Sequence, residues 1–186
     1  MPCAPCEPAP LLALVRRDLG GWPTEPTGAG QLRLRLSDTA SVTLDVCRQR
    51  LFMAHIERCE FAIAGGPPLP ASGRIEARQP GWFRRQPAVF RARRGDALAP
   101  LARYLNGFPS LRQTLSELDY RRFQLIVNEE GWRCTLEPWG ASLVVCRLPP
   151  LRRYIRLETH QRMLLLSALS MIAAAIARFE KASADQ

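Results

Sequence analysis

The sequence predicts an α+β protein in which an antiparallel β-sheet packs against a helix pair that includes a buried, apolar C-terminal helix. Two observations carry this prediction. From residue 31 onward, short runs of alternating apolar and polar residues are separated by turn residues, a pattern typical of antiparallel strands. Residues 163–177 contain no charged side chain, which is typical of a helix in a protein core. The length of 186 residues, with 47% hydrophobic and 23% charged residues, fits one folded domain.

We expect a Pro-rich tail, a short helix and a linker within residues 1–30, followed by a single α+β domain over residues 31–186. Four prolines among the first ten residues predict the irregular tail. The run LLALVRRDL predicts the helix at residues 11–19, and the two glycines after it predict its end. Residues 22–30 (WPTEPTGAG) are rich in Pro, Thr and Gly and predict the linker.

The first predicted strand shows the alternation most clearly. In QLRLRL, Leu32 and Leu34 would point to the core, whereas Arg33 and Arg35 would point to solvent. The remaining strands are expected at residues 42–46, 50–64, 73–79, 82–93, 121–128, 132–137, 142–148 and 152–157.

Two helices are expected between these strands, at residues 97–106 and 110–118, where leucines recur at helical spacing. The segments 73–105 and 132–169 also share an order of strand, turn, strand, proline, Arg-rich strand and helix. This shared order would fit a sheet built from two sheet-plus-helix halves.

The C-terminal helix is expected to begin near Thr159 and to be buried on all sides. Only Ser167 and Ser170 interrupt the apolar run between Arg162 and Arg178. At 1.5 Å per residue the run covers roughly 22 Å, short of the ~30 Å hydrocarbon core of a bilayer. We therefore expect a core helix and no transmembrane segment. Because the first residues lack the basic and apolar regions of a signal peptide, a cytoplasmic location is expected.

The six cysteines are expected to be reduced and to bind no metal or cofactor. The C-x-x-C motif at residues 3–6 lies in the Pro-rich tail, without the strand and helix that a redox pair needs. The other four form two pairs at twelve-residue spacing, wider than zinc knuckles have. A hairpin centred on Gly140 would place Cys134 opposite Cys146. The six thiols are Cys3, Cys6, Cys47, Cys59, Cys134 and Cys146.

No catalytic residue is assigned from the sequence. It contains no G-x-S-x-G, G-x-G-x-x-G, P-loop or H-E-x-x-H motif. There are two histidines, His55 and His160, and His55 would share a strand face with Glu57. A histidine beside a carboxylate keeps an enzyme of unrecognised type open as a hypothesis.

The most unusual property of the sequence is its positive charge. The net charge is +9, and every basic residue except Lys181 is arginine. A GC-rich bacterial genome favours arginine over lysine, but it does not explain why 26 cations face 17 anions. Residues 74–94 alone hold seven arginines against Glu76, a net of +6. Such a density attracts phosphates, acidic proteins or anionic lipid headgroups.

The predicted anion-binding surface joins this segment to the first strand. Alternation places Arg33 and Arg35 on one face of their strand, and Arg91 and Arg93 on one face of theirs. If the two strands are neighbours, these side chains form one surface. The candidate binding residues are Arg33, Arg35, Arg84, Arg85, Arg91, Arg93 and Arg94.

Residues 131–166 (GWRCTLEPWGASLVVCRLPPLRRYIRLETHQRMLLL) resemble an uncharacterised family of small proteobacterial proteins that is classed only as a domain of unknown function. The resemblance implies a bacterial origin. It implies no activity and no site residues.

The sequence predicts a non-enzymatic bacterial binding protein whose Arg-rich sheet face takes an anionic partner: a nucleic acid, an acidic protein or a lipid headgroup. One alternative is an adaptor similar to bacterial secretion chaperones, which have a loosely similar order of helices and strands but are usually acidic. The other alternative is the enzyme of unrecognised type. A homodimer is left open.

Overall fold

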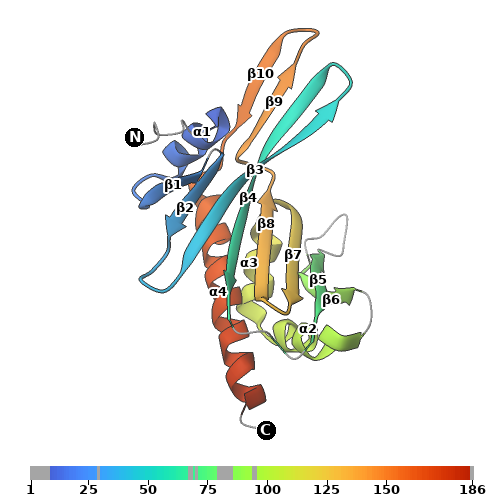
Figure 1. Ribbon diagram of the computed structural model, residues 1–186. Helices are drawn as coiled ribbons and strands as arrows, with labels where there is room; N and C mark the ends of the chain where they lie inside the picture. The colour runs from blue at the N-terminus through green and yellow to red at the C-terminus, as the bar shows by residue number, and fades with distance from the viewer. Residues whose placement is uncertain are drawn as a thin grey trace.

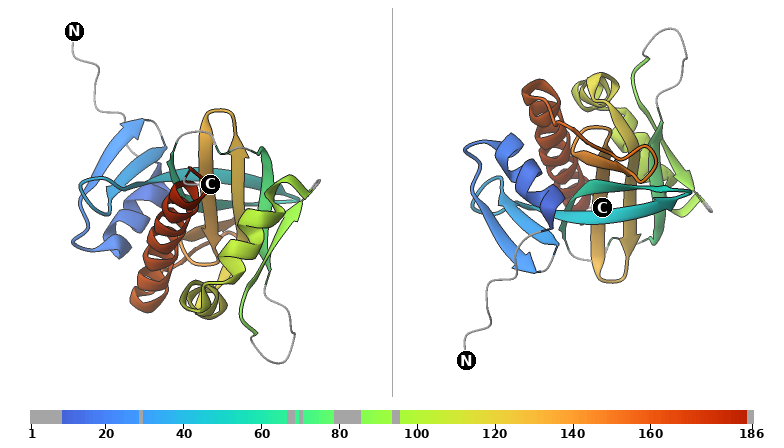
Figure 2. Two further views of the ribbon diagram at one scale, coloured as in Figure 1. Left: turned by 90° about the horizontal axis from the view of Figure 1, so that it is seen from below. Right: turned by 90° about the horizontal axis from the view of Figure 1, so that it is seen from above.

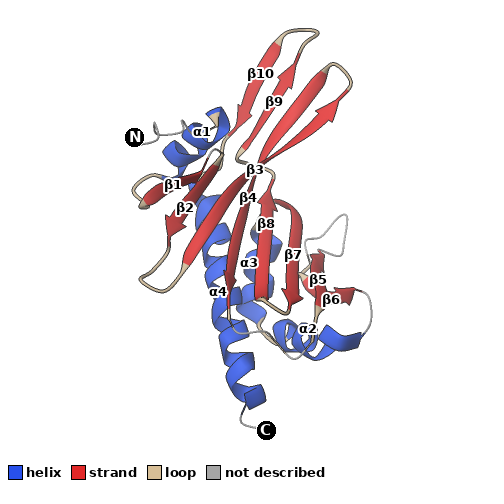
Figure 3. Cartoon of the chain, in the orientation of Figure 1, coloured by secondary structure: helices blue, strands red, loops and turns tan. Residues whose placement is uncertain are grey.

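The computed structural model describes residues 9–28, 30–66, 69, 71–78, 86–93 and 96–184, and it confirms the predicted α+β fold (Figure 1). In this part of the chain, ten strands form one antiparallel sheet and four helices pack on it (Figure 3). The helices are α1 (Pro10–Leu19), α2 (Ala99–Asn106, after a short 3-10 turn), α3 (Pro109–Glu117) and α4 (Thr159–Ala184). The strands are β1 (Thr24–Gly28), β2 (Gln31–Arg35), β3 (Ser41–Leu51), β4 (Ala54–Gly65), β5 (Gly73–Arg78), β6 (Val89–Arg93), β7 (Tyr120–Asn128), β8 (Gly131–Pro138), β9 (Ser142–Cys146) and β10 (Leu151–Ile155).

The strand order is β1-β2-β3-β4-β8-β7-β5-β6, with β9 paired to β4 and β10 paired to β9. One row of residues shows how the core is built. Leu32, Leu44, Phe61, Leu136 and Phe123 follow one another directly across five strands, and all five are buried. Because side chains alternate along a strand, every second residue lies on this face. All four helices cover it, and none of the helices in the described part of the chain lies on the opposite face of the sheet (Figure 2).

The N-terminal segment belongs to this core. The predicted first helix is α1, which ends at Gly20 with a φ of 67°. Its Leu11, Leu12 and Leu19 are completely buried. The linker predicted over residues 22–30 is wrong for β1, which pairs with β2 as an edge strand. Proline has no N–H to donate to a neighbouring strand, but on an edge strand one side of the backbone has no neighbour. A Pro-rich segment can therefore form an edge strand.

The structure differs from the prediction at two turns. The strand predicted over residues 50–64 contains the turn of the β3–β4 hairpin at Phe52-Met53, where Met53 has a φ of 57°. The sequence RLFMAH has no Gly, Pro, Asn or Asp to announce this turn.

The second difference concerns the hairpin predicted at Gly140, which is wrong. β9 continues along β4 in the same direction as β8, after a bulge at residues 139–141. A Cβ on Gly140 would lie 2.7 Å from the carbonyl oxygen of Arg156, so the bulge passes too close to the backbone for any other residue. Cys134 and Cys146 are therefore not opposite each other, since they face different residues of β4.

The C-terminal helix packs on the sheet as predicted, but it is not buried on all sides. α4 lies against β4 and β8 and contacts the other three helices. Leu165, Leu169 and Ile172 on its inner side are completely buried. The exposed side could not be recognised in the sequence because it consists mostly of alanine and serine, which occur both in cores and at surfaces. Within the uncharged run 163–177, the exposed positions are Met163, Ser167, Ser170, Ala174 and Ala177. By length and composition alone, Thr159–Ala182 would also suffice to cross a membrane, with a mean hydropathy of 1.7.

The two segments with a shared element order do not form equivalent halves. β5 and β6 pair with each other at one edge of the sheet, and α2 contacts β6. β8 and β9 instead lie along the central strand β4, and α4 packs over the middle of the sheet. The sheet is one continuous structure.

Candidate functional site

The structure places the predicted anion-binding arginines at two distant positions. Arg33 and Arg35 lie on β2, and Arg91 and Arg93 lie on β6. β3, β4, β8, β7 and β5 lie between these two strands, so they are not neighbours and their arginines do not form one surface. The other three candidates, Arg84, Arg85 and Arg94, lie outside the described residues.

Each of the two described arginine pairs also faces an acid. On β2, Arg35 forms an ion pair with Glu25 at 3.3 Å, and Arg33 lies directly opposite Glu25 in the strand register. On β6, Arg93 is 3.0 Å from Glu76, and Arg91 lies directly opposite Glu76. These acids offset part of the positive charge. That the four arginines bind an anion stays a prediction.

The rest of the sheet face opposite the helices also carries a network of ion pairs. Glu137 is buried and lies 2.7 Å from Arg121, and it lies 3.5 Å from both Arg58 and Arg122. Arg122 also pairs with Glu60, and Arg133 pairs with Asp45 at 3.0 Å. Arg58, Arg121, Arg122 and Arg133 thus have carboxylates within the fold, which weakens their attraction for external anions.

A different part of the sheet carries arginines that lack such partners. Residues 46–58 and 142–155 form a four-stranded arm that extends beyond the helices, at the top of Figure 1. It consists of the outer part of the β3–β4 hairpin and the whole β9–β10 hairpin, joined by the pairing of β4 with β9. The arm contains one acid, Glu57, and six arginines: Arg48, Arg50, Arg58, Arg147, Arg152 and Arg153.

Strand register brings basic side chains from both hairpins onto one face of the arm. Arg50 lies opposite His55, His55 opposite Val145, and Val145 opposite Arg152. Arg48 lies two residues from Arg50 on β3 and so shares this face. The result is a basic face built from residues that are about a hundred positions apart in the chain.

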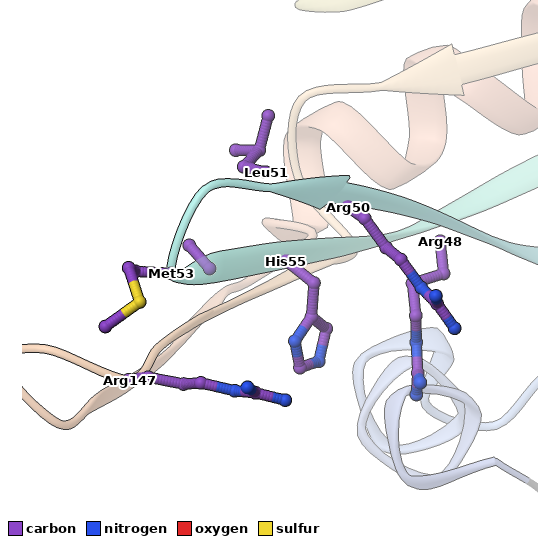
Figure 4. Close-up of a pocket in the computed structure, with 7 residues that line it drawn as sticks. Arg48, Arg50, Leu51, Met53, His55 and Arg147 are labelled. Atoms are coloured by element: carbon purple, nitrogen blue, oxygen red, sulfur yellow. The ribbon is translucent and has the colours of Figure 1, made fainter.

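This face borders a cleft of about 410 Å³, the basic cleft (Figure 4). The side chains of Arg48, Arg50, His55 and Arg147 extend toward the same side of the arm in Figure 4, whereas Leu51 points to the other side. The residues that line the cleft are Arg48, Arg50, Leu51, Met53, Ala54, His55 and Arg147.

Only one of the arginines in the cleft has a carboxylate beside it. Arg48 forms a short ion pair with the buried Glu57. Within the described chain, no ion pair is found for Arg50 or Arg147, nor for Arg152 on the same face. Their guanidinium groups are exposed and keep their hydrogen-bond donors available, and the planar guanidinium binds carboxylate or phosphate oxygens in pairs.

Asp18 of α1 attaches the base of the arm to the body. Its buried carboxylate accepts hydrogen bonds from the Tyr154 hydroxyl at 2.7 Å and from the Leu157 backbone N–H at 3.1 Å. Arg156 lies 3.5 Å from the same carboxylate. Burial and the hydrogen bond to Asp18 raise the pKa of Tyr154 well above its usual value. The link holds β10 at a defined position relative to the first helix.

The cleft is lined by arginines, one histidine and apolar residues. Among its lining residues there is no Ser, Thr, Cys or Lys. The Nε2 atom of His55 lies 3.9 Å from the Glu57 carboxylate, too far for the hydrogen bond of a catalytic dyad. The arrangement is suited to holding an anion.

None of the four described cysteines lines this cleft, and Cys3 and Cys6 lie outside the described residues. Cys59 and Cys134 are buried, and burial raises the pKa of both thiols. Cys47 is exposed, and partial burial of its thiol together with the neighbouring Glu60 raises its pKa. Among the described residues, no group of three or more His, Cys, Asp and Glu side chains is arranged to hold a metal ion.

Sequence reasoning missed the arm because its charges are divided between two chain segments. RQRLFMAH holds two arginines and CRLPPLRR holds three, so neither segment reaches the seven arginines of residues 74–94. One available signal was the presence of Leu, Phe and Met between Arg50 and His55, where a hairpin turn usually has polar residues. Another was the adjacent pair Arg152-Arg153, which follows Pro149-Pro150 after one leucine.

These features define a small, basic α+β protein with one antiparallel sheet and a projecting arginine-rich arm. Residues 17–176 match the model of a family described as Protein of unknown function (DUF3156), and the chain belongs to this family. The match extends from the end of α1 through most of α4, so the resemblance seen at residues 131–166 covers most of the chain. No curated protein and no solved structure matches it.

Proposed function

We propose that the protein is a binding protein that holds an anionic partner against the basic cleft of its arm. The observation that carries the proposal is the convergence of Arg50, Arg147 and Arg152 on one face of the arm without an acid beside them. The proposal keeps the class of function predicted from the sequence, but it locates the binding site on the arm instead of on the body of the sheet.

The contrast between arm and body supports this location. Body arginines such as Arg35 and Arg93 lie within 3.3 Å of a carboxylate, whereas Arg50, Arg147 and Arg152 of the arm are exposed and form no ion pair within the described chain. An arginine that already has a carboxylate partner must give up part of that interaction to bind another anion, and a free one does not. Surface charges act over a Debye length of about 8 Å at physiological salt, so the clustered arm arginines reinforce one another.

Binding of a fluorescent heparin fragment, used as a generic polyanion, tests the proposal by anisotropy over a series of salt concentrations. The arm variant carries Arg50→Ser, Arg147→Ser and Arg152→Ser. The matched control removes three exposed arginines from the body: Arg33→Ser, Arg35→Ser and Arg91→Ser.

The wild type is expected to bind at low salt and to lose affinity steeply as salt rises. The arm variant should bind at least about tenfold more weakly, and the body variant should stay within about threefold of wild type. Equal losses in the two variants would show that net charge alone drives binding. A loss confined to the body variant would return the site to the arginines predicted from the sequence. In either case the arm would not be the site.

A further inference from the structure

The outer end of the arm carries exposed apolar side chains on both hairpins. Phe52, at the β3–β4 turn, is 95% exposed, and Leu148, at the β9–β10 turn, is 76% exposed. Leu51, Met53 and Leu151 beside them are also exposed. We call these five residues the apolar tip. They make up more than half of the exposed large hydrophobic residues in the described chain, and no element of the fold covers them.

The strand register orders the arm from an apolar end to a basic zone. The last paired row contains Leu51, Ala54, Cys146 and Leu151, with no charged side chain. The next row contains Arg50, His55, Val145 and Arg152. Successive rows of an antiparallel sheet are about 3.4 Å apart, so the first arginines lie only a few ångströms behind the tip.

Two further arginines follow at a distance that matches the depth of a lipid headgroup region: Arg153, and Arg48 with its partner Glu57. Gln49 lies in the same row as Arg153, and Arg48 lies in the row behind it. Arg48 is thus about 10 Å from the last paired row. Peripheral proteins bury apolar side chains about 5–10 Å into the headgroup and acyl boundary, where basic residues reach the phosphates.

We propose that the arm docks on an anionic membrane surface, with the apolar tip inserted among the lipids and the arm arginines on the headgroup phosphates. The inference rests on the proposed function, because the same arginines bind the anion. It adds that the anion is a lipid phosphate and that apolar insertion contributes to binding.

The chemistry of the tip favours a membrane over a nucleic acid. Binding to single-stranded nucleic acid relies on aromatic rings that stack on bases, and Phe52 is the one aromatic residue of the five. The other four are flexible aliphatic or thioether side chains spread over two turns. Lipid chains accept such side chains without a fixed geometry, and positive charge directly behind them complements an anionic surface.

Co-sedimentation with vesicles tests the inference. One set of vesicles contains phosphatidylcholine alone, and the other contains phosphatidylcholine mixed with phosphatidylglycerol. The tip variant carries Phe52→Ser and Leu148→Ser, and both positions are exposed, so folding should be unaffected. Its matched control carries Ile126→Ser and Met163→Ser, which remove two exposed apolar side chains from the body.

The wild type is expected to bind the anionic vesicles and not the neutral ones. The tip variant should bind the anionic vesicles about tenfold more weakly, because two apolar side chains no longer leave water. The arm variant described above should lose on the order of a hundredfold, since each arginine near an anionic surface contributes about fivefold. The body control should bind like the wild type.

Insertion has a direct spectroscopic readout as well. A Phe52→Trp variant should gain fluorescence that anionic vesicles with brominated acyl chains quench, beyond the quenching seen for the wild type. Tryptophan at an inserted tip lies within reach of the bromines, whereas tryptophan in a headgroup-level contact does not.

Three results would overturn the inference and leave the proposed function standing. The first is tip-variant binding equal to wild type, and the second is no added quenching for Phe52→Trp. The third is heparin or single-stranded DNA binding that depends on the arm arginines, without vesicle binding. Absence of binding to vesicles, heparin and DNA alike would overturn both proposals.

Discussion

Replacing Asp18 with alanine is expected to cost about 3–5 kcal/mol of folding stability, because this residue joins α1 to the base of the arm. Its side chain is completely buried, between a hydroxyl group on β10 and a backbone N–H that precedes α4. These partners are 136 and 139 residues away in the chain, so the contact exists only in the folded protein.

The magnitude follows from the two hydrogen bonds that the carboxylate accepts. A hydrogen bond to a charged group contributes about 1.5–3 kcal/mol. Without Asp18, the Leu157 N–H remains buried with no acceptor, and an unsatisfied buried donor costs about 1–3 kcal/mol. The Arg156 guanidinium is mostly exposed and is rehydrated, so its 3.5 Å ion pair adds little.

Urea unfolding of the wild type, Asp18→Ala, Tyr154→Phe and the double variant measures these terms. Tyr154→Phe alone should cost about 1–2 kcal/mol, and the cycle should give a coupling energy of at least about 1 kcal/mol. Asp38→Ala, at an exposed turn, is the control and should lie within about 0.5 kcal/mol of the wild type. A loss below about 1 kcal/mol for Asp18→Ala, or a coupling energy near zero, would refute the reasoning.

Four further predictions test other parts of the fold. Ile172→Asp should leave no cooperative unfolding transition, because it places an unpaired charge at a fully buried position of α4; a normal melting curve would contradict this. Gly140→Ala should cost about 2–3 kcal/mol in a denaturation curve because its Cβ meets backbone, whereas Gly21→Ala, with nothing within 4 Å, should be nearly neutral. Burial raises the pKa of Tyr120 to about 12, from about 10 in an unfolded chain. The stability that the neutral Tyr120 hydroxyl contributes is therefore complete below pH 10 and is lost as the pH rises toward 12. The free energy of unfolding should fall by up to about 1.4 kcal/mol per pH unit in this range, and Tyr120→Phe should make this fall less steep. Mass spectrometry after brief iodoacetamide treatment should find Cys59 unmodified in the native protein, and rapid modification would show that its strand opens readily.

The elements of secondary structure were largely predictable, because alternation and helical spacing are relations between consecutive residues. Leu32 and Leu34 alternate with arginines and are buried as β2, and the helix from Thr159 begins where it was expected. The errors lie where neighbours in space override the local pattern. The bulge after β8 follows β4 instead of turning back, and β1 joins the sheet because β2 offers it a free edge.

The sequence alone determined the α+β class, the excess of positive charge and the exclusion of the common catalytic motifs, since all three depend only on which residues are present and in what order. Only the tertiary structure decided which arginines keep their charge unopposed. Arg133 meets Asp45 across 88 residues of chain, and Arg93 meets Glu76 across a strand pair, so dense runs of arginine are partly neutralised. The arm gathers Arg50 and Arg152 with no acid opposite either of them. Coulombic interaction depends on distance in space, and the strand order that sets those distances is a property of the whole fold.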